Sequence, residues 1–343
     1  MHNPYRGREP RAFWNSAVAE RHLADMADLW DPIALHPDDR IATAGSCFAQ
    51  HIGNALAARG AHFLDCEPPP PVFADATEAR RFGYGVFSCR YGNVYTARQM
   101  LQLAQEALGL RRPADVVWER EGRFYDALRP AVDPAGHANA DTVLLARRLH
   151  LGAVRTMLET MDVMVFTLGL TECWESQVDG TVYPTAPGTL AGSFDPAAHA
   201  FRNLRHGEVL ADMAAFWALL KEVNPDARLL LTVSPVPLMA TAGGGHVLPA
   251  TVYSKSVLRA VAGDLAADHP DIAYFPSYEI ITGHPSRGMF FNPDLRTVNA
   301  MGVDLVMRQF FAGPLASVFA PPGRLAKPEP EAICEEGRIT ETL

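Results

Sequence analysis

Short apolar segments alternate with longer amphipathic segments along most of this chain. Five segments have the length and continuous hydrophobicity of buried strands: residues 40–44, 61–64, 162–169, 228–235 and 272–275. Apolar residues at helical spacing predict helices over residues 49–59, 96–108, 142–160, 207–222, 253–267 and 299–311. Strands that are apolar throughout and alternate with helices are typical of a parallel sheet covered on both faces. The pattern therefore predicts a doubly wound α/β fold with about five parallel strands.

Four other regions depart from this alternation. Residues 116–131 alternate as a β-hairpin does, and a loop rich in Pro, Gly and Thr is expected over residues 176–205. We expect one α/β domain over residues 39–315, with an insertion at about 66–140. An N-terminal arm, residues 1–38, is polar and aromatic, and a tail, residues 316–343, is rich in Pro and Glu and expected to be flexible.

Composition narrows the class of protein. The chain has 343 residues, 48% of them hydrophobic, so it can bury a substantial core. Its formal net charge of −9 argues against a nucleic-acid partner, because phosphate binding requires a concentrated basic surface. The five cysteines include no CxxC pair, which argues against a structural metal site or a disulfide framework. No signal peptide or membrane span is evident, so we expect a cytoplasmic protein.

The strongest candidate for chemistry is the turn Gly45-Ser46-Cys47-Phe48-Ala49, which follows the first predicted strand. In open α/β sheets, ligands bind beyond the carboxyl ends of the strands. A thiol at the start of the following helix would have its pKa lowered by the helix dipole. The alternative is that Ser46 only caps the helix and Cys47 is a small buried residue.

Other strand ends supply weaker candidates. The segment Gly169-Leu170-Thr171-Glu172 follows the third strand and offers a hydroxyl and a carboxylate, although a capped turn would look the same. His246 lies in a glycine-rich loop after the fourth strand, and His284 lies after the fifth. Asp294 and Arg296 precede the last helix, where either could simply cap it.

The turn and several later segments resemble the GSCFA-domain family, which is named after the first of them. The other matching segments are Tyr91–Thr96, Phe166–Glu172, Thr232–Pro237, Tyr253–Ser256 and Phe275–Glu279. The resemblance covers about residues 35–315. It implies an architecture similar to that of SGNH hydrolases, which use a flavodoxin-like sheet for ester hydrolysis or acyl transfer.

Alignment with the SGNH pattern on Gly45 implies a role for each segment. Cys47 takes the position of the nucleophile and Ser46 that of the preceding aspartate, although Ser46 would be the nucleophile after a shift of one residue. Gly92 would donate an oxyanion-hole N–H, with Asn93 beside it. Thr171 replaces the asparagine that provides the second donor.

The resemblance fails at the last segment. SGNH enzymes place Asp-x-x-His there, but this chain has Asp294 with Thr297 at the histidine position. A nucleophile needs a base. His246 is our preferred replacement and His284 is the other candidate.

The resemblance thus implies an ester hydrolase or acyltransferase acting on a carbohydrate or a related small polar substrate. The expected binding groups are Asn93, Glu172, Arg129, His284 and Arg296. No cofactor is expected, although a transferase would need an acyl donor such as acyl-CoA. The alternative is a non-catalytic module that binds a ligand in an SGNH-like shell. A redox role for Cys47 is weaker still, because no resolving cysteine lies near it in sequence.

Overall fold

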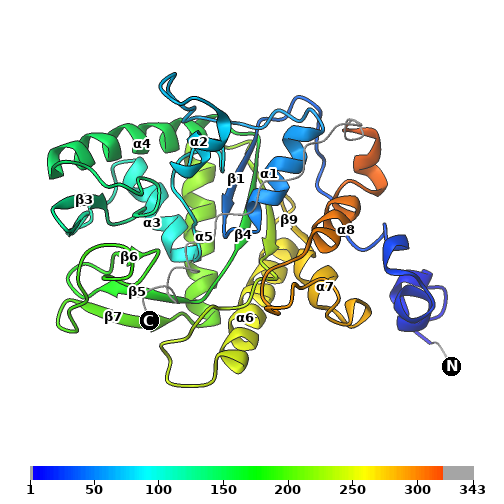
Figure 1. Cartoon of the computed structure of the whole chain (residues 1–343). Helices are drawn as coiled ribbons and strands as arrows, with labels where there is room; N and C mark the ends of the chain where they lie inside the picture. The colour runs from blue at the N-terminus through cyan, green and yellow to red at the C-terminus, as the bar shows by residue number, and fades with distance from the viewer. Residues whose placement is uncertain (1–2, 320–343) are drawn as a thin grey trace.

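A sheet of four parallel strands forms the centre of the protein (Figure 1), in a computed structural model that describes residues 3–319. The strands stand in the order β1-β4-β8-β9, and they are β1 (Ile41–Gly45), β4 (Val163–Leu168), β8 (Arg228–Val233) and β9 (Ile272–Phe275). Helices cover both faces, as the alternation of apolar and amphipathic segments requires. The predicted α/β fold class is therefore confirmed.

Each face of the sheet has its own set of helices. One face is covered by α3 (Ala97–Ala107), α4 (Ala140–Thr160), α5 (His206–Val223) and α6 (Val247–Asp268). The other is covered by α1 (Ala49–Ala58), α7 (Ser277–Thr282) and α8 (Ala300–Phe310). Because side chains alternate across a strand, Met164 and Phe166 of β4 belong to the first core, while Val163 and Val165 belong to the second. All of these side chains are buried, which explains why the strands are apolar throughout.

The sheet has four strands rather than about five, so the predicted strand at residues 61–64 is wrong. That segment touches the sheet at a single bridge, Phe63 to Ile41. Farther along β1, the outer edge is occupied by another segment: Thr43 accepts a hydrogen bond from the backbone of Ser88 and donates one to its hydroxyl. Because the edge is already hydrogen-bonded there, residues 61–64 cannot continue as a strand.

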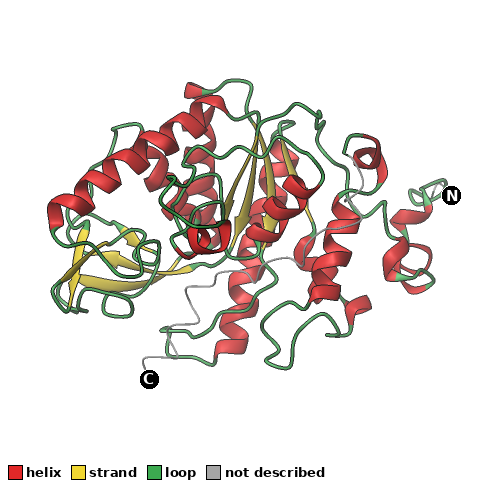
Figure 2. Ribbon diagram, turned by 45° about the horizontal axis from the view of Figure 1, so that its top comes forward, coloured by secondary structure: helices red, strands yellow, loops and turns green. Residues whose placement is uncertain are grey.

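The predicted loop at residues 176–205 is also wrong in part, because it contains strands. A three-stranded antiparallel sheet in the order β6-β5-β7 is formed by β5 (Glu172–Ser176), β6 (Val182–Tyr183) and β7 (His199–Asn203). Figure 2 shows this sheet standing apart from the central one. The hairpin predicted at residues 116–131 is present as β2 (Val117–Arg120) and β3 (Arg123–Asp126). A short helix, α2 (Ala76–Arg81), precedes this hairpin within the predicted insertion at about residues 66–140.

The N-terminal arm is made of short helical turns and packs beside the second core. Its turns cover Pro10–Ala12, Asn15–Ala19 and Leu23–Asp25. Trp30 then places its ring against Phe275 and Phe310, with ring centroids 5.0 and 5.8 Å away. The predicted tail, residues 316–343, lies outside the described residues from residue 320 onward. Within residues 3–319, no helix is long and apolar enough to cross a membrane.

Candidate active site

Gly45 ends β1 in a conformation that only glycine adopts readily. Its φ is +132°, and a Cβ at this position would lie 2.4 Å from the carbonyl oxygen of Thr167. The next residue, Ser46, donates its backbone N–H to the same oxygen at 3.1 Å. The turn is therefore pressed against the end of β4, at the carboxyl edge of the sheet where ligands bind in open α/β folds.

Ser46 and Cys47 lie between this turn and the first turn of α1. Their carbonyl oxygens accept hydrogen bonds from the backbone N–H groups of Ala49 and Gln50, at 2.9 and 3.2 Å. Both side chains are buried. The Cβ of Ser46 lies 3.1 Å from the point where Gly169 would carry a Cβ. Its hydroxyl has no hydrogen-bond partner among the residues described. Ser46 therefore packs against the end of β4, and Cys47 is the residue that leads into the helix.

A second segment brings Gly92 and Asn93 to the same place. Val94 donates its N–H to the carbonyl oxygen of Gly45 at 2.9 Å. The carbonyl oxygen of Tyr95 accepts from the backbone N–H groups of Gly169 and Leu170 at 3.0 and 2.9 Å. The segment therefore crosses from the end of β1 to the end of β4. Gly92, with a φ of +68°, makes the bend just before it, and the buried Asn93 follows.

Thr171 is fully buried and joins two further elements to the site. Its N–H donates to the hydroxyl of Ser254 on α6 at 3.0 Å, and its own hydroxyl donates to the Oδ1 of Asn203 at 2.7 Å. The hydroxyl hydrogen is thus engaged by Asn203 and does not point to an oxyanion in this arrangement. Asn203 itself is exposed at the end of β7. Sequence reasoning missed it, because it falls in a region interpreted as a loop.

Lys255 is the second residue that sequence reasoning missed. It is 1% exposed, and its Nζ donates to the carbonyl oxygen of Gly169 at 2.7 Å. Burying an ammonium group is costly, so a buried lysine at the end of a strand is a candidate functional residue. The signal was present in the sequence, because Tyr253–Ser256 is one of the segments that match the family.

Neither predicted histidine contacts Ser46 or Cys47. His246 is exposed and caps α6, accepting the backbone N–H of Leu248 on its Nδ1 at 3.1 Å. His284 is also exposed, and its ring meets that of Trp14 edge-on at 5.7 Å. Among the described residues, no other hydrogen bond or ring contact is formed by either side chain.

The remaining predicted residues hold loops around the strand ends. Asp294 accepts hydrogen bonds from the backbone N–H groups of Arg296 and Thr297 and from the Thr297 hydroxyl. Slight desolvation raises the pKa of Asp294, but these hydrogen bonds outweigh it and lower the pKa. Glu172 accepts from the hydroxyl of Thr241 at 2.7 Å, and burial raises its pKa. Glu172 thereby ties the loop that precedes His246 to the small sheet.

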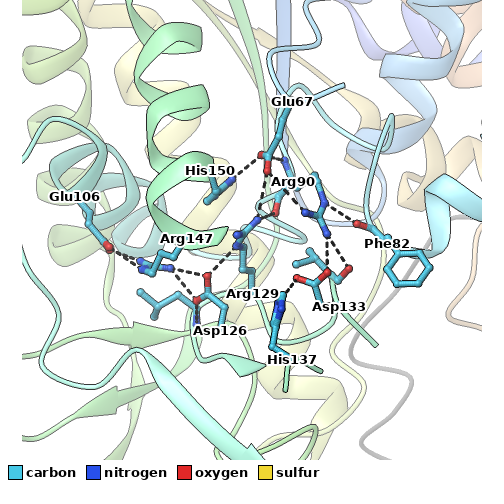
Figure 3. Close-up of polar contacts among 12 residues, drawn as sticks. Glu67, Phe82, Arg90, Glu106, Asp126, Arg129, Asp133, His137, Arg147 and His150 are labelled. Carbon is cyan, nitrogen blue, oxygen red and sulfur yellow. Dashed lines mark hydrogen bonds and ion pairs between the residues drawn. The ribbon is translucent and has the colours of Figure 1, made fainter. Parts of the chain in front are cut away.

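Arg129 lies in a buried network of charges rather than on the surface of the site (Figure 3). It donates to Asp126 at 2.8 Å and to the carbonyl oxygen of Arg90 at 3.1 Å, and it lies 3.6 Å from Glu67. Glu67 in turn accepts from the N–H of Arg90 and contacts His150 at 2.7 Å. Arg129 therefore supports the backbone just before Gly92, so its predicted role as a substrate ligand has no support in this position.

This network has strongly shifted pKa values. Burial raises the pKa of Glu67, but contacts with His150 and Arg129 outweigh it and lower the value to about 2. Burial lowers the pKa of His150 to about 4, helped by the nearby charge of Arg129. At neutral pH, Glu67 is therefore ionised and His150 is neutral. No group of three or more His, Cys, Asp or Glu side chains within residues 3–319 is arranged to hold a metal ion.

The fold and this site define an α/β protein in which the segment after Gly92 and the end of β4 meet the turn after the first strand. The sequence matches the GSCFA family over residues 40–310, and the chain belongs to that family. Among solved structures it is similar to an acetyl xylan esterase (Est2A) from the rumen bacterium Butyrivibrio proteoclasticus, with 12% identity and a TM-score of 0.23. That alignment covers 72% of this chain and 57% of the esterase, so the chain spans little more than half of that enzyme's length. No curated protein matches the sequence.

Proposed function

We propose that this protein is an enzyme that cleaves or transfers an ester-linked acyl group, with Cys47 as its nucleophile. One observation carries the proposal: Val94, two residues after Gly92, hydrogen-bonds to Gly45, and Gly169 packs on Ser46. Lys255 in turn bonds the carbonyl oxygen of Gly169, and Thr171 follows two residues later. Nucleophile, hydrogen-bond donors and a basic group must converge in this way for acyl transfer.

Cys47 is better placed than Ser46 for attack. Ser46 packs its Cβ against Gly169, and its hydroxyl has no exposed surface. Cys47 lies just before the ten-residue helix α1, where the helix dipole favours a thiolate. A thiolate also needs less activation than a serine hydroxyl. Ser46 then serves to hold the turn in place.

Stabilisation of the oxyanion would come from the backbone N–H groups of Cys47 and Gly92 and from Asn203. The hydroxyl of Thr171 holds the Oδ1 of Asn203, which leaves the amide nitrogen of this exposed side chain to act as the donor. The hole would therefore use an asparagine from β7 in place of the asparagine that Thr171 replaces.

A carbohydrate or related polar substrate fits the face of the small sheet beside the turn. Trp174 pairs with Phe201 and Glu172 pairs with Asn203 across β5 and β7, so all four side chains lie on one face. Aromatic rings beside hydrogen-bonding groups are a suitable lining for a sugar ring. Hydrolysis would need no cofactor, whereas transfer would need an acyl donor such as acyl-CoA. Among the described residues, Cys66, Cys89 and Cys173 form no disulfide, which fits a reducing compartment such as the cytoplasm.

The test compares Cys47→Ala with Ser46→Ala on a chromogenic acetate ester and on acetylated saccharides. Cys66→Ala is the matched control, because Cys66 is a half-buried thiol in a different segment. We expect Cys47→Ala to lose turnover at least about 100-fold while keeping its far-UV spectrum, and the control to retain it. If wild-type protein hydrolyses no ester but binds acetylated saccharides, the non-catalytic binding module replaces this proposal.

A further inference from the structure

Two adjacent residues of α6 attach this helix to the end of β4. Ser254 accepts the N–H of Thr171, and Lys255 donates to the carbonyl oxygen of Gly169. Both side chains are buried, at 0 and 1% exposure. Helix α6 therefore places a buried hydroxyl and a buried amine beside the residues that follow β4.

Gly169 connects the amine to the nucleophilic turn. Its carbonyl oxygen takes the hydrogen bond from Lys255, and its Cα faces the Cβ of Ser46 closely enough that a methyl group there would lie 3.1 Å away. Gly169 thus contacts both the amine of Lys255 and the turn that carries Cys47.

The chemistry of this site requires a group that accepts the thiol proton. His246 and His284 are exposed and engaged elsewhere, and Thr297 stands where related enzymes carry the histidine. His51 on α1 is an alternative base, because it is titratable and lies four residues after Cys47. Its ring contacts that of Phe48. A buried lysine is suited to the task, because burial in general disfavours the ammonium form and produces basic amines.

We propose that Lys255 is the general base of this site, an inference that rests on the proposed function. The proton of the Cys47 thiol moves to the neutral Nζ of Lys255, and the sulfur forms a bond to the ester carbonyl carbon. The carbonyl electron pair moves to oxygen. When it returns, the carbon–oxygen bond to the alcohol breaks, and the leaving oxygen takes the proton from Lys255. An acyl thioester remains on Cys47. Water then attacks it, giving a proton to Lys255, which returns it to the departing sulfur.

The experiment measures two quantities across pH: ester turnover, and the rate at which iodoacetamide alkylates Cys47, followed by peptide mass spectrometry. Lys255→Gln keeps an N–H donor for Gly169 but removes the base. Lys255→Met removes both. Lys221→Met is the matched control, because this lysine is half-buried on α5 and bonds backbone carbonyls. His51→Asn tests the other titratable group.

We expect wild-type Cys47 to be alkylated with an apparent pKa at least about one unit below the usual 8.5, and Lys255→Gln to raise it by at least about one unit. Turnover should fall at least about 100-fold in Lys255→Gln and remain in Lys221→Met. If Lys255→Met does not fold, the Gln variant still decides the question. Folding of each variant is checked by thermal unfolding.

The two proposals fail in different ways. Turnover that depends on Cys47, together with an alkylation profile that Lys255→Gln leaves unchanged, would overturn the role of Lys255 and leave the proposed function standing. A profile that shifts in His51→Asn alone would overturn it in favour of His51. Turnover that survives Cys47→Ala would overturn the proposed function, whatever Lys255 does to the thiol.

Discussion

Val94 donates its backbone N–H to the carbonyl oxygen of Gly45 at 2.9 Å, and this hydrogen bond joins two segments that are far apart in the sequence. Gly45 begins the turn that contains Cys47, the proposed nucleophile, and Val94 follows the Gly92 bend by two residues. Backbone hydrogen bonds therefore set the position of the proposed nucleophile relative to Gly92, the proposed oxyanion donor. Side chains support this arrangement.

Replacing Gly45 with alanine should damage the fold. The new methyl group would lie 2.4 Å from the backbone of Thr167, in a conformation that L-residues rarely adopt. We expect a loss of roughly 3 kcal/mol or more in the free energy of unfolding, measured with urea. Gly152→Ala is the control: it lies within α4 with open space around it, and should be neutral or stabilising by up to about 1 kcal/mol. Equal effects of the two substitutions would contradict the account of the turn.

Thr171→Val should reduce catalysis more than it reduces stability. Valine matches the shape of threonine but cannot hold the Oδ1 of Asn203, which the hydroxyl contacts at 2.7 Å. We expect kcat to fall about 10- to 100-fold, since a single oxyanion donor contributes on that order or more. Thr171→Ser keeps the hydroxyl and should retain most of the activity. Asn203→Ala, a change at an exposed residue, should match the valine variant in kcat. An unchanged kcat in Asn203→Ala would remove this residue from the oxyanion hole.

Arg129→Met should destabilise the protein strongly. The substitution leaves Asp126 without one of its two arginine partners in a buried site, and breaking such a pair costs roughly 3–5 kcal/mol. Arg155→Met removes an exposed pair with Glu159, and should cost less than about 1 kcal/mol. If Arg129 instead bound substrate, its variant would unfold like wild type and show only a raised KM.

Acid should destabilise the protein through His150 and Glu67. Their pKa values in the folded protein, about 4 and about 2, lie below the ordinary values of 6.5 and 4.5. The unfolded chain therefore binds more protons than the folded one. The resulting stability is complete above about pH 6.5 and is lost as pH falls, first through His150 and then through Glu67.

The variant that tests this dependence is His150→Gln. Its free energy of unfolding should fall less steeply between pH 6.5 and pH 4, by up to about 1.4 kcal/mol per pH unit. Urea unfolding at several pH values measures the slope. Identical slopes in the two proteins would show that His150 does not titrate on unfolding in this range.

The sequence predicts those helices and strands whose own residues show a clear hydrophobic pattern. The strands that became β4 and β8 are apolar throughout because both faces are covered, and the helix predicted over residues 96–108 is present as α3. Residues 61–64 show the same hydrophobic pattern, but they do not form a strand because Ser88 occupies the edge of β1. The local sequence pattern cannot predict that contact. The small sheet was missed because β7 pairs with β5 across about twenty residues rich in turn formers.

The site shows the same division. The turn at Ser46 and Cys47 was predicted as a site from its place between a strand and a helix, and Gly92 and Thr171 were added from the family resemblance; their roles stay predictions. Lys255 lies in a segment that resembles the family and Asn203 does not, but the proposed role of each rests on a contact, with Gly169 or Thr171, that only the folded chain makes. The two histidines were chosen for their chemistry, but both lie exposed and away from the nucleophilic turn.

The proposed reaction requires Cys47 to carry the acyl group. Mixing the protein with a chromogenic acetate ester, quenching in acid within the first turnover and mapping the peptides by mass spectrometry would test this directly. We predict an added acetyl group on Cys47 that disappears on hydroxylamine treatment and is absent from Cys47→Ala. An acetyl group on Ser46, or turnover with neither residue modified, would contradict the central claim.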